Sequence, residues 1–125
     1  MDESMSAPQR LQRSRKKGAR LPPGTVCVTR GTRWGNPYRV SDYMVTAHRC
    51  QRTAAGMAAR DFMEALWCGK LRITPADVRL ELRGKVLACY CALDMPCHAD
   101  TLIEVANSEP GSTWTEQLSA VMRRR

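Results

Sequence analysis

The sequence predicts a small α/β fold with a short, mostly parallel sheet and flanking helices. Two apolar runs, "TVCVTR" at residues 25–30 and "KVLACY" at residues 85–90, have the composition of buried strands. Segments with helical spacing of apolar residues lie between these runs and after the second one. Ligand sites of such folds lie beyond the carboxyl ends of the parallel strands, so the loops after these two runs are the candidates.

The ends of the chain are cationic. Residues 1–20 hold six basic and two acidic side chains, Leu21-Pro22-Pro23-Gly24 follows them, and the last three residues are arginines. This composition predicts a disordered basic tail over residues 1–22, followed by a single α/β domain over residues 23–125 that ends in a helix. Such ends suit attraction to DNA or RNA phosphates, although a merely solvated leader has the same composition.

The first half of the domain contains one strand, one long loop and one helix. A strand is expected over residues 25–29, and the loop "RGTRWGNP" should adopt a positive φ at Gly31 or Gly35. "YRVSDYMV" predicts a second short strand. A helix is expected over residues 53–68 before Gly69, because apolar residues recur there at helical spacing: Ala54, Ala58, Phe62, Ala65 and Leu66.

The second half contains three predicted helices around a buried strand. Thr74 as N-cap, with Pro75 and Asp77 in the first turn, starts a short helix that ends at Gly84. "KVLACY" is the buried strand, and a helix over residues 98–107 follows a loop at 92–96. Thr113 and Glu116 form a capping box for the last helix.

The loop after the first strand has the residues of a nucleotide pocket. Arg30 and Arg33 can pair with phosphate, and Gly31 and Gly35 permit close approach of the backbone to a ligand. Trp34 can stack on a base, and Asn36 can read a base edge. In the alternative, the segment is a tight turn in which Trp34 fills the core and Asn36-Pro37 bends the chain.

The second candidate segment, "LACYCALDMPCHADTL", holds three cysteines and a histidine. Cys89, Cys91, Cys97 and His98 are a permitted ligand set for zinc, although neighbours such as Cys97 and His98 rarely bind one ion and Cys89 and Cys91 share a strand face. Alternatively, Cys97 at a helix N-terminus is an activated thiol and His98 moves a proton. In a third interpretation the cysteines are small core residues.

The composition favours the cytoplasm and argues against disulfides. No apolar run approaches the roughly 20 residues of a membrane span, and the N-terminus has no apolar signal core. Thiols stay reduced in the cytoplasm, so the six cysteines are read as core residues, metal ligands or reactive groups.

With both loops considered, the sequence resembles the family called domain of unknown function 4326, found in bacteriophages and their actinobacterial hosts. The resemblance covers roughly residues 22–106 and is carried by "VTRGTRWGNPY" and "LRGKVLACYCALDMPCHADTL". Thr29, Tyr90 and Ala99 depart from the residues common in the family. The resemblance implies a Rossmann-like three-layer fold, a phage or mobile-element context in the cytoplasm of a bacterial host, and similarity to small folds that act on N-glycosidic bonds.

Together these features predict an enzyme, a hydrolase or transferase directed at a nucleotide or a nucleic-acid base. Cys97 and His98, supported by Asp100, are expected to perform the chemistry; no cofactor is firmly implied, and zinc is the alternative. The second hypothesis is a non-enzymatic, zinc-stabilised phage module that binds DNA or a host protein.

Overall fold

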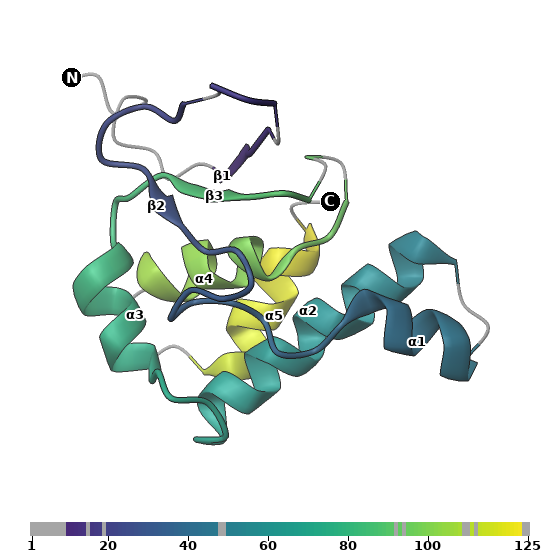
Figure 1. The fold of residues 1–125 in the computed structure, drawn as a ribbon. Coiled ribbons are helices and arrows are strands. Elements are labelled where there is room, and N and C mark those ends of the chain that lie inside the picture. Colours follow the sequence, from purple (N-terminus) through teal and green to yellow (C-terminus); the bar gives the residue numbers. More distant parts are fainter. Residues whose placement is uncertain are drawn as a thin grey trace.

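A computed structural model describes residues 10–14, 16–18, 20–47, 50–91, 93, 95–108, 111 and 113–123. Its sheet has three parallel strands, β1 (Arg10–Gln12), β2 (Val26–Cys27) and β3 (Leu87–Cys89), in the order β1-β3-β2. Leu11 of β1 and Cys27 of β2 both align with Ala88, so β3 is the central strand (Figure 1). The three residues of β3 are fully or almost fully buried, as expected of a short apolar strand with neighbours on both edges.

Strand β1 corrects the predicted N-terminal boundary. Residues 10–12 were expected in a disordered tail, yet they pair in register with all three residues of β3, and the backbone N–H of Arg13 continues the ladder to the carbonyl of Cys89 at 2.7 Å. The segment carries a single apolar side chain, Leu11, and its order therefore comes from pairing with a distant strand rather than from its own composition. Residues 1–9 of the predicted tail lie outside the described part of the chain.

Helices α1 (Val40–Ala47) and α2 (Gln51–Trp67) follow β2 and pack against each other. The expected strand at residues 38–45 is wrong, because most of this segment is α1. Its β-branched residues favour a strand locally, but packing on α2 decides the conformation. Helix α2 confirms the prediction from apolar spacing: Ala54, Ala58 and Phe62 are buried along one side, and Gly69 follows the helix with a φ of +78°.

Three shorter helices complete the fold, and each begins as the sequence predicts. Helix α3 (Pro75–Leu82) starts with the Thr74 and Asp77 capping box. Helix α4 (His98–Ala106) has Cys97 as its N-cap. Helix α5 (Trp114–Arg123) starts with reciprocal hydrogen bonds between Thr113 and Glu116.

Helix α4 connects the sheet to the helical part of the molecule. It contacts β3 and β1 on one side, and it also packs against α2, α3 and α5. In the view of Figure 1 the sheet lies at one end of the described chain and the helices lie together on the other side of it. The structure thus confirms a mixed α/β fold with an open parallel sheet and five helices in its described residues. We expected three layers; the described residues form one sheet and one group of helices.

The hydrophobic core among the helices includes four residues that are at most 1% exposed: Phe62, Leu66, Leu102 and Val105. None of the described helices is both long and apolar enough to cross a membrane.

Candidate functional site

A pocket of about 440 Å³ lies at the edge where the parallel strands β2 and β3 end. Both candidate loops of the sequence contribute to its walls, together with the start of α1 and one side of α2. The lining residues are Thr29, Arg30, Asn36, Tyr38, Val40, Ala55, Ala58, Cys89, Tyr90, Cys91, Pro96, Cys97 and His98. Two segments some fifty residues apart therefore share one site, at the carboxyl ends of parallel strands where ligands of α/β folds bind.

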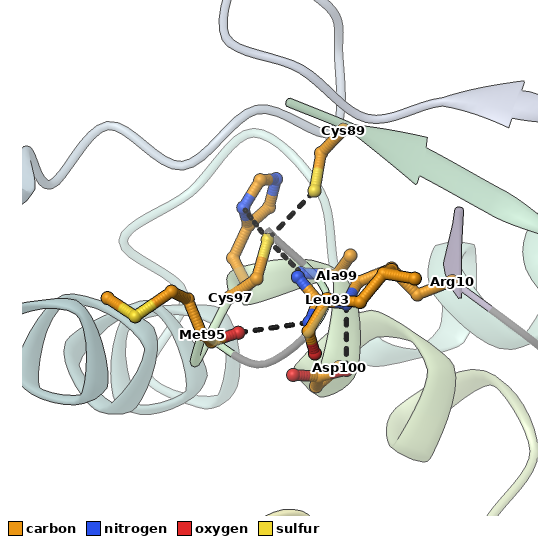
Figure 2. A network of polar contacts seen from close by, with 8 residues as sticks. Arg10, Cys89, Leu93, Met95, Cys97, Ala99 and Asp100 are labelled. Carbon is orange, nitrogen blue, oxygen red and sulfur yellow. Dashed lines mark hydrogen bonds and ion pairs between the residues drawn. The ribbon is translucent and has the colours of Figure 1, made fainter. Parts of the chain in front are cut away.

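The cysteines gather at one end of this pocket. The sulfur atoms of Cys89, Cys91 and Cys97 all lie within 4.8 Å of one another, and the Cys89 and Cys97 sulfurs are 3.0 Å apart. Figure 2 shows the side chains of Cys89 and Cys97 pointing toward each other. The strand ends at Cys89, so Cys91 lies beyond it and is not restricted to the strand's alternation of faces. Three cysteines so close together could hold a metal ion.

The thiol groups of the three cysteines are hydrogen-bonded to one another. The pKa of Cys89 is lowered because the Cys91 and Cys97 thiols donate hydrogen bonds to its sulfur. The same contacts raise the pKa of Cys97, whose sulfur faces the Cys89 thiolate. The three thiols therefore titrate together, and hydrogen bonds within the cluster stabilise its first negative charge.

His98 begins α4 beside the cluster and is only 8% exposed. Its Nε2 lies 2.6 Å from the carbonyl oxygen of Val28. A carbonyl can only accept, so Nε2 carries the proton, and burial lowers the pKa of the imidazole so that the ring stays neutral. Nδ1 is then the unprotonated nitrogen, and it lies 3.6 Å from the Cys97 sulfur.

The Arg10 guanidinium ties β1 to the loop between Cys91 and Cys97. Its Nη2 donates to the carbonyl oxygens of Leu93 at 2.7 Å and Met95 at 2.9 Å, and its Nε lies 3.4 Å from a carboxylate oxygen of Asp100 (Figure 2). The role of Arg10 could not be predicted from sequence, because nothing local distinguishes it from the other basic residues of the N-terminal segment.

This pairing changes the role expected for Asp100. The carboxylate is the ion-pair partner of Arg10 and is not among the residues that line the pocket. The described lining contains no aspartate or glutamate, so its acid and base groups are the thiols, His98 and the tyrosines Tyr38 and Tyr90.

The two arginines of the glycine-rich loop have different environments. Arg30 is exposed and lines the pocket. Arg33 faces α3, where its guanidinium lies 2.6 Å from Glu81 and 3.7 Å from Asp77. It also covers the ring of Trp34 at 4.7 Å from the centroid. The structure therefore places only Arg30 of this pair beside the cysteines.

Trp34 and Asn36 hold the glycine-rich loop in place through contacts with the core and with α2. The Trp34 side chain is part of the hydrophobic core and is 7% exposed, which matches the core-filling alternative rather than a stacking face in the pocket. Asn36 lines the pocket, but its Nδ2 donates to the carbonyl oxygen of Ala58 at 3.2 Å and its Oδ1 accepts from the backbone of Tyr38 at 2.9 Å. Its amide thus braces the loop against α2.

The two glycines of this loop shape its backbone. Gly31 has a φ of +96°, as predicted for one of the two positions. A Cβ on Gly35 would lie 2.9 Å from the Cα of Arg30 and from the carbonyl oxygen of Thr29, so the chain can fold back on itself only with glycine there. Both glycines line a second cavity of about 490 Å³, on the side of the loop that also holds Arg33.

Comparison with known proteins gives one match. Residues 11–108 match the model of a family described as "Domain of unknown function (DUF4326)". The chain matches no curated protein and no solved structure.

Proposed function

The chain belongs to this domain family of unknown function, and we propose from its pocket that it is an enzyme directed at a nucleotide or a nucleic-acid base. In this proposal the scaffold is a small Rossmann-like fold that works in the cytoplasm of a bacterial host, in a phage or mobile-element context. The observation that carries the proposal is the meeting of Arg30 and the Cys97-His98 pair in one pocket.

The pocket suits a ligand of this size and charge. Its volume of about 440 Å³ falls within the range of about 300–1,000 Å³ typical of small-molecule sites. Arg30 offers an exposed guanidinium for a phosphate group, and among the described residues no carboxylate forms an ion pair with it. Tyr38 and Tyr90 line the same pocket and take the stacking role that Trp34 cannot fill.

The chemistry proposed for the pocket is hydrolysis or group transfer with thiol and imidazole groups. The unprotonated Nδ1 of His98 provides a base at its floor, and zinc held by the thiols would supply an activated water as the nucleophile. Glycosidases that act through paired carboxylates have no counterpart in the described lining, so action on an N-glycosidic bond would have to use these groups. Zinc is the cofactor we propose for the thiols.

The experiment is a calorimetric titration of nucleoside monophosphates and the corresponding nucleosides into three forms of the protein: wild type, Arg30→Ala and Arg33→Ala. A hydrogen bond to a charged group contributes about 1.5–3 kcal/mol, so Arg30→Ala should weaken nucleotide binding by about 10-fold to 150-fold. It should leave nucleoside binding nearly unchanged, because nucleosides have no phosphate.

Arg33→Ala is the matched control, since Arg33 lies in the same loop but pairs with α3. Its nucleotide affinity should equal that of wild type. An absence of nucleotide binding by wild type, or an equal loss in both variants, would refute the assignment. If binding is found, chromatography of an incubated mixture identifies the bond that is broken.

A second candidate is a DNA-binding module with a zinc-stabilised loop, and the exposed side chains of Lys16, Lys17 and Arg20 favour it. It predicts salt-dependent retention on DNA that is lost when all three are changed to alanine. It further predicts no nucleotide binding in the titration above, which separates the two candidates.

A further inference from the structure

We propose that Cys89, Cys91 and Cys97 form a three-thiolate zinc site at the floor of the pocket, with the fourth position of the ion open toward the pocket. This inference rests on the proposed function, because that function gives the ion its role in the pocket. The presence of the ion is tested separately, without substrate. Three protein ligands leave the fourth position open for water or substrate, as in catalytic zinc sites.

The distances fit tetrahedral coordination. With zinc-sulfur bonds of about 2.3 Å, two sulfur ligands of one ion lie about 3.8 Å apart. The Cys89 and Cys97 sulfurs lie 3.0 Å apart, and no pair among the three cysteines exceeds 4.8 Å. The separations therefore bracket the required value, and adjustments of about 1 Å or less in side-chain position would accommodate the ion.

His98 lies beside the cluster without joining it. Its Nδ1 is 3.6 Å from the Cys97 sulfur, but the ligand atoms that lie within 4.8 Å of one another are the three cysteine sulfurs. The contact from Nε2 to the carbonyl of Val28 fixes the tautomer that leaves Nδ1 free to accept a proton. The fourth position of the ion is therefore left to water or substrate, with an imidazole base beside it.

Arg10 lies beside the cluster and carries a positive charge. Three thiolates on a divalent ion leave a net charge of −1, and the buried Arg10 guanidinium is close enough to Cys89 and Cys97 to interact with both. Arg10 also binds the carbonyl oxygens of Leu93 and Met95, between the second and third cysteines. The same side chain therefore offsets the charge and holds the loop that carries the ligands.

Loading of the site exchanges protons for metal. Zinc binds thiolates, so each cysteine that is still protonated releases its proton to solvent as its sulfur coordinates. No oxidation or reduction takes place, and affinity should increase with pH.

The first experiment measures metal content and cobalt spectra on protein purified without a metal-affinity tag. We expect about one zinc per chain, and cobalt added to the metal-free protein should give the intense visible bands of a tetrahedral site with thiolate-to-cobalt charge transfer. Cys89→Ser and Cys97→Ser should each lower metal affinity by about 100-fold or more, above the 10–100-fold typical of residues that only support a ligand.

Cys68→Ser is the matched control, because Cys68 is exposed and lies outside the cluster. It should bind zinc as wild type does. His98→Gln should leave the cobalt spectrum of three thiolates and one water unchanged, because His98 lies outside the cluster. A spectrum that shows a lost nitrogen ligand in His98→Gln would overturn the open fourth position.

A measurement on wild type alone guards against variants that do not fold. Zinc should protect three of the six thiols from alkylation, identified by mass spectrometry as Cys89, Cys91 and Cys97, and a chelator should expose them. A disulfide between Cys89 and Cys97, or equal labelling of the three with and without zinc, would overturn the proposal. Neither result affects the comparison of Arg30→Ala with Arg33→Ala, so the two proposals fail separately.

Discussion

Replacing Arg10 by methionine tests whether β1 is an integral part of the fold. Methionine keeps an unbranched stem of similar length but removes the guanidinium; the Arg10 side chain is 7% exposed, and that of its partner Asp100 is 15% exposed. Two hydrogen bonds from a charged donor contribute about 1.5 kcal/mol each at the lower end of their range. The ion pair adds up to about 1 kcal/mol, so we expect a loss of about 3–4 kcal/mol in the free energy of unfolding, in line with the cost of breaking a buried pair.

The assay is equilibrium unfolding in urea, with zinc either present throughout or absent throughout, because a bound metal raises apparent stability. Arg13→Met is the matched control. Arg13 is the next arginine along the chain, and its guanidinium lies over the Tyr90 ring at 4.8 Å, a contact that contributes about 0.5–1 kcal/mol. Adding Asp100→Asn to Arg10→Met should restore part of the loss by removing the unpaired charge. If Arg10→Met costs no more than Arg13→Met, the account of β1 and the loop is wrong.

Two further predictions concern other parts of the structure. Gln117→Leu should lower the free energy of unfolding by about 1–3 kcal/mol. The buried Gln117 amide accepts from the Trp67 indole N–H at 2.9 Å and donates to Ser108 at 2.9 Å, and the substitution removes both hydrogen bonds. Thermal and urea unfolding measure the loss, and a neutral effect would contradict the prediction. The hydrogen bond with Thr53 lowers the pKa of Cys50, so its thiolate forms at lower pH. Alkylation of Cys50 should therefore begin at lower pH in wild type than in Thr53→Val. Identical pH profiles of alkylation in the two proteins would disprove the effect.

Four of the five described helices were predicted from sequence because their signals are local, whereas α1 was expected to be a strand. Apolar spacing at Ala54, Ala58 and Phe62 defines the buried side of α2 without knowledge of its partners. Thr74 and Asp77 cap α3 by contacts within four residues of chain. The two loops were also placed correctly at one edge of the sheet, since parallel strands align their carboxyl ends.

The prediction was incomplete where the outcome depends on distant partners. Arg10 and Leu11 give no strand signal by themselves, and their order comes from pairing with Leu87 and Ala88. In the glycine-rich loop, the sequence could not tell that Arg33 would meet Glu81 while Arg30 faces the cysteines. The identity of a residue shows what its side chain can do, but which side of a loop it occupies is decided by the elements packed around it.

The central position of β3 has a consequence for how the chain acquires its structure. Both outer strands hydrogen-bond to β3 and not to each other, so neither can pair until residues 87–89 have left the ribosome. The helices before β3 can form on the nascent chain, whereas β1 must remain unpaired until β3 has emerged. Contacts of such high sequence separation slow folding, so we expect assembly of the sheet to be the late, rate-limiting event and the cysteine-bearing floor of the pocket to form together with it.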